Sequence, residues 1–370
     1  MSGVTDFGAL TVAQKKVWSG KIWKVFRDES FFQSNGFIGT NMNTPIHRVD
    51  ELTKTSRGLE CVMQLVNDLE EDGTVNDNDL TGNEENMVND AQIIQIDLLA
   101  HAVKSKGEMS EQATVLRFRE QAKNKLGFWL PDKIDELMFL TISGRAYTYK
   151  TDLSTRSASS QLPQLSFAAD VSAPTTNRVK YAGSATTEAT LTTSDKMSWS
   201  MCVTAKTYAR RQGIRPIRQG GKEYYAMVIS PEQRRDLLLD STYQTIVSRA
   251  AERGMSNPLF KNAIVVIDGL ILYEHRKVIN TEGLTSGVDK WGSGQTVDGA
   301  QAQLFGAGAL GFTTLGSSNW LEGDVNDYGR KPSIGYQQMF GLLKPKYKPL
   351  KSSASAEDYG TIAVKTAAAF

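Results

Sequence analysis

The stretch Ser110–Ser143, SEQATVLRFREQAKNKLGFWLPDKIDELMFLTIS, carries the longest helical pattern in the chain. Ser110 fits an N-cap, Glu111 lies favourably at the positive end of a helix, and Gly144 fits a stop. Arg117, Arg119, Lys123, Asp132 and Asp135 fall on other faces than the apolar residues. The apolar stripe recurs at gaps of three and four and consists of Val115, Phe118, Ala122, Leu126, Trp129, Leu130, Ile134, Leu137, Met138 and Thr141.

Unbroken, such a helix would be about 51 Å long, several times the usual three turns. Pro131 lies inside the pattern, where its ring would meet the carbonyl of Gly127. A glycine at that position favours a bend over a break, so the stretch predicts a long strut. The alternative is a pair of ordinary core helices in a globular enzyme.

Composition limits the function classes. The 370 residues include 42 basic and 41 acidic side chains, a formal charge of +1, which argues against a general binder of nucleic acid or membrane surfaces. No run approaches 18 apolar residues and the N-terminus lacks a signal pattern, so we expect a protein made and used in the cytosol. Two cysteines in apolar segments and three scattered histidines predict no catalytic, cofactor or metal residues; they are Cys61, Cys202, His47, His101 and His275.

The N-terminus predicts an arm. Residues 13–27 form a basic amphipathic helix pattern, and a polar, turn-rich segment studded with aromatics follows it. Such a segment buries little within itself, so it must lie on another surface or dock on its own domain. The apolar side of the helix is Val17, Trp18, Ile22, Trp23 and Phe26, and its basic side is Lys15, Lys16, Lys21, Lys24 and Arg27.

An acidic ribbon follows. Between Arg57 and Lys104 there are 11 Asp or Glu residues and no Lys or Arg. Residues 59–66 and 91–99 read as strands, and the 24 residues between them are polar. A loop of that length is usually functional or disordered. The pattern predicts a two-stranded ribbon with a large acidic tip, which leans on a partner surface because an isolated hairpin is marginal in water.

The tip contains an approximate calcium-binding loop. Asp68, Glu70, Asp72, Gly73 and Asp79 follow the spacing of the EF-hand loop, but Glu stands at the third position and Asp at the twelfth. The flanks read as strands instead of helices. We therefore expect a solvated or partner-facing tip instead of a calcium site.

The remaining chain predicts a compact α+β domain. A Ser/Thr-rich connector spans 145–200, a helix capped by Thr193 or Ser194 runs to Gly213, and a strand covers 224–229. A helix starting at Ser230-Pro231 runs to about residue 254, and strands 263–267 and 270–273 flank an Asp268-Gly269 turn. Residues 306–311 match the dinucleotide motif G-x-G-x-x-G, but no helix pattern follows, so packed turn glycines are expected. Strands at 334–343 and 361–364 complete the chain.

Five segments in order resemble the major capsid proteins of tailed phages, specifically the N-four-type family with the Hong Kong 97 fold. They are LTGNEE at 80–85, KGEMSEQATVLRFREQAKNKLGFWLPDKIDELMF at 106–139, EYYAMVISPEQRRDL at 223–237, NPLFKNAIVVIDGLILYEH at 257–275 and DYGRKPSIGYQQMFGLLKPKY at 327–347. The resemblance covers about Arg57 to the C-terminus. The first 50 residues and the insert at 145–192 match less well.

The resemblance implies a division of this α+β chain. Residues 1–50 would be the N-arm, 51–107 the extended E-loop hairpin, and 108–150 the spine helix of the peripheral domain. The Ser/Thr-rich insert would span 151–192 and the axial domain 193–325. Residues 326–370 would return to the peripheral domain and supply a C-terminal strand.

The resemblance implies a structural shell subunit without catalysis or cofactor. It would form hexamers and pentamers of an icosahedral virion capsid, assembled in the host cytoplasm around double-stranded DNA that it contacts non-specifically. Portal, scaffold or decoration proteins would be separate partners, and no membrane is expected. The alternatives are a cytosolic α+β enzyme with an acidic metal-binding loop and a calcium-dependent surface-layer or adhesion protein.

Overall fold

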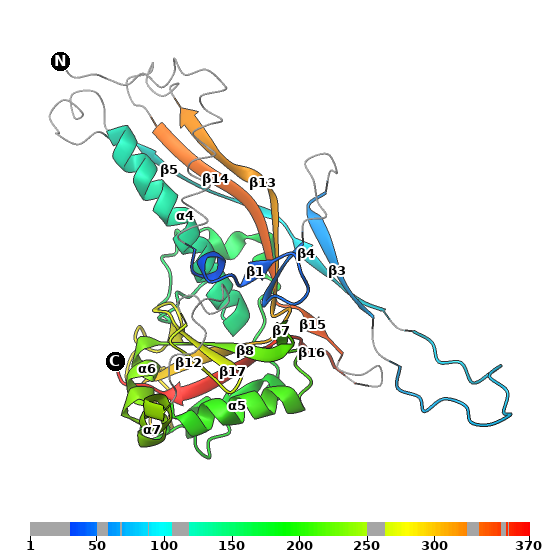
Figure 1. Ribbon diagram of the computed structural model, residues 1–370. Coiled ribbons are helices and arrows are strands. Elements are labelled where there is room, and N and C mark those ends of the chain that lie inside the picture. The colour runs from blue at the N-terminus through cyan, green and yellow to red at the C-terminus, as the bar shows by residue number, and fades with distance from the viewer. Residues whose placement is uncertain are drawn as a thin grey trace.

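The computed structural model describes residues 30–49, 58–66, 69–87, 89–105, 118–249, 263–323, 333–348, 353 and 355–370. Two large sheets organise them: a five-stranded sheet with one long helix beside it, and an eight-stranded sheet covered by shorter helices (Figure 1). A two-stranded ribbon projects from the side. Within the described residues, no helix is long and apolar enough to cross a membrane.

The five-stranded sheet is built on one long hairpin. Its order is β1 (Ile38–Gly39), β2 (Ile46–Val49), β13 (Leu310–Gly323), β14 (Ser333–Leu343) and β5 (Asp97–Lys104). Strands β13 and β14 pair antiparallel with a register shift between Leu315 and Asn319, whereas β2 adds to β13 in parallel. The strand predicted at 334–343 is confirmed.

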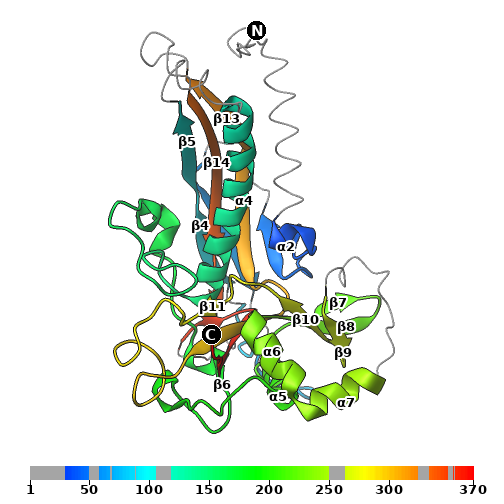
Figure 2. The ribbon, with the colours of Figure 1, turned by 90° about the vertical axis from the view of Figure 1, so that its left-hand side faces the viewer.

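The long helix α4 (Phe118–Ser143) runs along this sheet (Figure 2). It continues through Pro131 without a break, and it ends at Gly144, whose φ is +68°. The predicted stop is therefore confirmed; residues 110–117 of the predicted helix lie outside the described part. The glutamines of a neighbouring strand cap the helix end, because Gln301 donates to the carbonyl of Ser143 and Gln303 to its hydroxyl.

Most of the stripe on α4 is buried, from Ala122 to Thr141. Two positions differ from the prediction. Trp129, expected in the stripe, is only half-buried and stacks on His101, with ring centroids 4.5 Å apart. Asp135, placed on a polar face by the sequence, is 4% exposed. The side of the helix that meets residues 30–37 had no local signal in the sequence.

The eight-stranded sheet has the order β6 (Val179–Tyr181), β17 (Thr361–Ala367), β12 (Gly299–Phe305), β8 (Lys222–Ile229), β10 (Leu270–Glu274) and β9 (Val265–Ile267). Two short strands join its edges, β11 (Ile279–Asn280) on β12 and β7 (Ile217–Gln219) on β8. The predicted hairpin is confirmed: β9 and β10 pair antiparallel, and Asp268 and Gly269 both have positive φ.

Helices lie against this sheet with boundaries that depart from the prediction. Helix α5 (Trp199–Arg211) begins at the N-cap Ser198, later than the expected Thr193 or Ser194. The single helix expected from 231 is two, α6 (Pro231–Leu239) and α7 (Ser241–Arg249). Asp240 separates them; its carboxylate accepts from the backbone N–H of Trp199 and Thr242.

The Ser/Thr-rich insert is more integrated than a connector. It holds short 3₁₀ turns at Leu162–Gln164, Ser166–Ala168, Thr176–Arg178 and Glu188–Thr190, and it supplies β6 to the eight-stranded sheet. Phe167 is fully buried within the core. The remaining small elements are α2 (Phe31–Ser34), β15 (Lys346–Tyr347) and β16 (Glu357–Asp358).

The sheets do not divide the chain at the expected boundary of 325. Strand β13, expected with 193–325, lies in the five-stranded sheet, and β17, expected with 326–370, lies in the eight-stranded sheet. The chain crosses between sheets at Gly306–Ala309. Pairing between segments that are distant in sequence decides which sheet a strand joins, and the local residue pattern carries no information on that choice.

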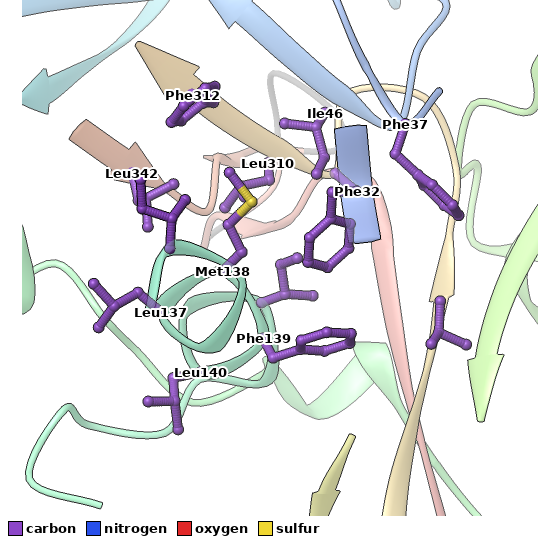
Figure 3. Packing of buried hydrophobic residues seen from close by; sticks show 14 of the residues in the cluster. Phe32, Phe37, Ile46, Leu137, Met138, Phe139, Leu140, Leu310, Phe312 and Leu342 are labelled. Carbon is purple, nitrogen blue, oxygen red and sulfur yellow. The ribbon is translucent and has the colours of Figure 1, made fainter. Parts of the chain in front are cut away.

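One core joins the two units. Residues 137–140 at the lower end of α4 meet Phe32 and Phe37 on one side and Leu310, Phe312 and Leu342 of the five-stranded sheet on the other (Figure 3). The same cluster includes Val228, Ile271 and Phe305 of the eight-stranded sheet. Helix α4 thus lies at the junction of the two sheets, beside residues 30–37, which we call the arm segment.

Candidate assembly surfaces

The ribbon projects from the two large sheets and is largely exposed (Figure 1). Strands β3 (Glu60–Val66) and β4 (Asn89–Gln95) pair antiparallel over their full length, as the sequence predicted (Figure 1). Strand β4 passes at Ile96 into β5, so the ribbon continues directly out of the five-stranded sheet. A rigid base therefore holds a projecting hairpin.

The base of the ribbon crosses the five-stranded sheet at two glycines. A Cβ on Gly311 would collide with Met63, and one on Gly341 with the carbonyl of Gln95. Ile94 is fully buried there beside Cys61 and Leu343. This close approach buries the base and leaves the distal part of the ribbon without cover.

Hydrogen bonds from backbone N–H groups to carboxylates stabilise the tip, residues 69–87. Glu85 accepts from the backbone N–H of Glu70 and Glu71 at 2.9–3.0 Å, and Glu84 accepts from Gly82. Several apolar side chains are exposed on the ribbon and its tip: Leu59, Val62, Val66, Leu69, Val75, Leu80, Met87 and Ile93. Eight exposed apolar side chains on one projecting element indicate a surface that another molecule covers.

The calcium-like spacing does not gather ligands in the described residues. Glu70 is held at its backbone by Glu85, and Asp68 lies outside the described part. No group of three His, Cys, Asp or Glu side chains close enough to hold a metal is present among the described residues. The tip carries negative charge without the geometry of a cation site.

A second feature is the buried contact between the arm segment and α4. Asp135 of α4 accepts from the hydroxyl of Ser30 at 2.8 Å and from the backbone N–H of Phe31 at 2.7 Å. Burial raises the pKa of Asp135 to about 6, although both hydrogen bonds and nearby Lys277 favour the charged form. We call this contact the arm anchor.

Aromatic rings complete the arm anchor. The ring of Phe31 packs at a tilt against His275 with centroids 4.4 Å apart, and His275 stacks on Phe139 at 5.1 Å. Burial, together with Lys277 and Arg276, lowers the pKa of His275 to about 4. Its Nδ1 accepts from the backbone N–H of Lys277, so the ring is held neutral. Neither Asp135 nor His275 is predicted as an anchor residue by the sequence pattern.

The other chemically reactive side chains are structural. Cys61 and Cys202 are buried and form no disulfide, and burial raises the pKa of the Cys202 thiol to about 12, which makes it inert. His101 stacks on Trp129. Glycines 306 and 308 form the crossing between β12 and β13, as expected for packed turn glycines; a Cβ on Gly306 would meet the carbonyl of Arg215 at 2.5 Å. The motif opens no helix.

Basic residues gather at the end of α5 and on the β7–β8 hairpin. Arg210, Arg211, Arg215, Arg218 and Lys222 are all exposed, and Glu223 pairs with Arg210 at 2.8 Å and with Arg218 at 3.3 Å. We call these five residues the basic patch. The basic patch was not predicted, although residues 206–222 (KTYARRQGIRPIRQGGK) form a visible basic run in the sequence.

The chain is similar to known shell proteins over its whole length. The family described as phage capsid protein matches residues 9–370. The major capsid protein of Pseudomonas phage KPP25 is 37% identical over 374 residues, which cover 98% of each chain.

Solved structures agree in fold. The capsid of Ralstonia phage GP4 superposes with a TM-score of 0.77 at 26% identity, covering 93% of this chain and 92% of that one. The capsid of Cyanophage Pam1 gives 0.70 at 16% identity, with 90% and 91% covered. The enzyme and surface-layer alternatives receive no support. The expected Hong Kong 97 fold is confirmed, and the chain belongs to the phage capsid protein family, whose members are structural shell subunits of tailed phages.

Proposed function

We propose that this major capsid protein forms hexamers and pentamers that close into an icosahedral shell around double-stranded DNA. The observation that supports the proposal most is the ribbon, which is ordered at its base and exposes apolar side chains along its length. A hairpin of this kind has no stabilising cover within its own subunit. Neighbouring subunits of a shell would supply one.

The fold elements receive shell roles on the same basis. The five-stranded sheet with α4 would be the peripheral domain, the eight-stranded sheet with α5–α7 the axial domain, and β3–β4 with the tip the E-loop. Residues 30–49 would form the root of the N-arm, held by the arm anchor. The spine helix would transmit load between these parts, because its lower end lies in the common core.

Electron microscopy of the purified full-length protein tests the shell function. We expect closed shells, or rings of five and six subunits, at high protein concentration. A discrete small oligomer at every concentration and salt would contradict the proposal.

Packaged DNA would touch the inner face without reading sequence. A chain with a net charge of +1 offers few excess cations, so contacts with phosphate would be weak and salt-dependent. We expect equal binding to unrelated duplexes and a steep loss with added salt in a filter-binding assay. A footprint on one defined sequence at physiological salt would contradict this.

Portal, scaffold and decoration proteins would be separate partners, and assembly would take place in the host cytoplasm. Co-expression with a portal protein tests the first point. We expect heads in which the portal occupies one capsomer position. Fractionation of infected cells tests the second, with shells expected in the cytosolic fraction.

A further inference from the structure

The basic patch lies beside an apolar groove. A cavity of about 360 Å³ opens between the base of the ribbon, strand β2 and the crossing at Gly308. Arg215 belongs to both the patch and the groove wall. The groove is lined by residues that include Met42, Val62, Leu65, Arg215, Tyr347 and Tyr359.

Most of the basic patch lacks a partner within the described part of the chain. Glu223 is the carboxylate that pairs with Arg210 and Arg218, and no ion pair is formed there by Arg211, Arg215 or Lys222. The backbone fixes the patch: Arg218 donates its N–H to Asn43 at 3.0 Å, and Asn43 donates to the carbonyl of Arg218. These hydrogen bonds connect the β7–β8 hairpin to residue 43, next to Met42 in the groove wall.

The ribbon tip has the complementary chemistry. Residues 69–87 carry seven carboxylates and no Lys or Arg, and four large apolar side chains of the tip are exposed: Leu69, Val75, Leu80 and Met87. The carboxylates are Glu70, Glu71, Asp72, Asp77, Asp79, Glu84 and Glu85. An acidic tip with exposed apolar side chains is complementary to a groove that is lined by apolar and aromatic side chains and has Arg215 in its wall.

The tip of a given subunit points away from its own groove. The groove wall includes Val62, Met63, Gln64 and Leu65 of β3, whereas the tip extends beyond the ribbon and away from both large sheets (Figure 1). A contact between two different surfaces of identical copies is heterologous, and such contacts close into rings when the rotation fits.

We infer that the groove and its basic patch receive the ribbon tip of a second copy of this chain, with tip carboxylates on the arginines and a tip apolar side chain in the groove. The inference rests on the proposed shell function and adds the receiving site. Each subunit would give one tip and receive one. The contact would weaken with salt, since exposed charge pairs are screened.

Charge reversal in pairs tests it. Arg215→Glu with Lys222→Glu reverses the patch, and Glu71→Lys with Asp77→Lys reverses the tip; all four side chains are exposed and outside the core. We expect each pair alone to lower the yield of shells by about tenfold or more, because like charges then meet at every subunit contact. The fourfold variant should recover to within about twofold of wild type.

A matched control separates pairing from net charge. Lys125→Glu with Lys150→Glu changes the net charge equally at two exposed positions away from the groove. Combined with the tip reversal, this pair should restore net charge without restoring shells. Circular dichroism confirms folding of every variant, and wild-type assembly in the same buffers tests the shell function separately.

Three outcomes would overturn the inference. Normal shells from either reversal pair would show that the surfaces do not meet. Failure of the fourfold variant, with both pairs defective and folded, would assign the patch and the tip to different partners. Normal shells with less packaged DNA from the patch reversal would assign the patch to nucleic acid.

Discussion

Asp135 and His275 lie on either side of Phe31 and titrate in opposite senses. The folded-state pKa of Asp135 is raised from 3.8 to about 6, so its contribution to stability is present below pH 3.8 and lost as pH rises through 6. The pKa of His275 is lowered from 6.5 to about 4, so its contribution is present above pH 6.5 and lost as pH falls through 4. Each amounts to about 3 kcal/mol.

Their opposition predicts that the anchor is insensitive to pH between about 4 and 6 in the wild type. Asp135→Asn removes one of the two titrating groups. Because only His275 then titrates at the anchor, the free energy of unfolding should rise with pH across that window. His275→Phe keeps the aromatic stack and should give the reverse slope. Denaturant unfolding of the unassembled subunit at several pH values measures both.

Parallel slopes in the two variants would contradict this account of the anchor. Lys277 and Asp132 also face Asp135, so their ion pair must be unchanged for the comparison to hold. Asp132 is half exposed and lies at the surface end of this cluster, which makes Asp132→Asn a suitable control with a smaller effect.

Burial decides how much each stripe residue on the spine contributes. Leu137 is fully buried, and Leu137→Ala should destabilise the subunit by about 2–5 kcal/mol. Trp129 is only half-buried, so Trp129→Ala should destabilise the subunit by less than the loss of about 3–5 kcal/mol expected for a fully buried tryptophan. Denaturant midpoints rank the two variants, and a larger loss for Trp129→Ala would contradict the packing described here.

At the scale of elements, Pro131 is the feature of the spine that sequence and structure both single out. The helix continues through it, and Gly127 stands where the ring would meet a carbonyl. Pro131→Ala restores an N–H at this position, so we expect a folded subunit with altered helix curvature and a changed size or yield of shells. Shells identical to wild type in size, yield and stability would show that the proline has no role in assembly.

The sequence predicted elements whose signals are local. The periodic stripe of α4, the stop at Gly144, the ribbon strands and the Asp268-Gly269 turn are of this kind. Helix α5 was placed too early because Thr193 and Ser194 compete with Ser198 as caps, and only tertiary contact selects among them. The break at Asp240 depends on Trp199, 41 residues away.

The assembly surfaces were predicted only in part, for the same reason. The ribbon tip can be identified from the sequence alone, because its acidic residues are not interrupted by Lys or Arg. The arm anchor, in contrast, joins Ser30 to Asp135 across 105 residues, and a buried carboxylate on a helix looks like a solvated one in sequence. The basic run at 206–222 was visible but averaged away in a net charge of +1.

At the scale of the whole molecule, the subunit is a rigid centre with two extensions. The common core holds α4 and residues 30–37 together between the sheets, and the ribbon projects away from the sheets (Figure 1). The stability of such a subunit depends on its neighbours. Neighbouring subunits bind only the folded subunit, and this binding shifts the folding equilibrium by mass action. The central claim is that the ribbon tip is needed for assembly and not for folding.

Replacing residues 67–88 by Asn-Gly tests that claim most directly. Val66 and Asn89 are paired neighbours at the end of the ladder, so a two-residue turn closes the ribbon without changing its register. Circular dichroism and sedimentation of the variant report folding and assembly together. We predict a soluble subunit with a wild-type spectrum that forms no stable shells; shells of wild-type yield and size would contradict the account.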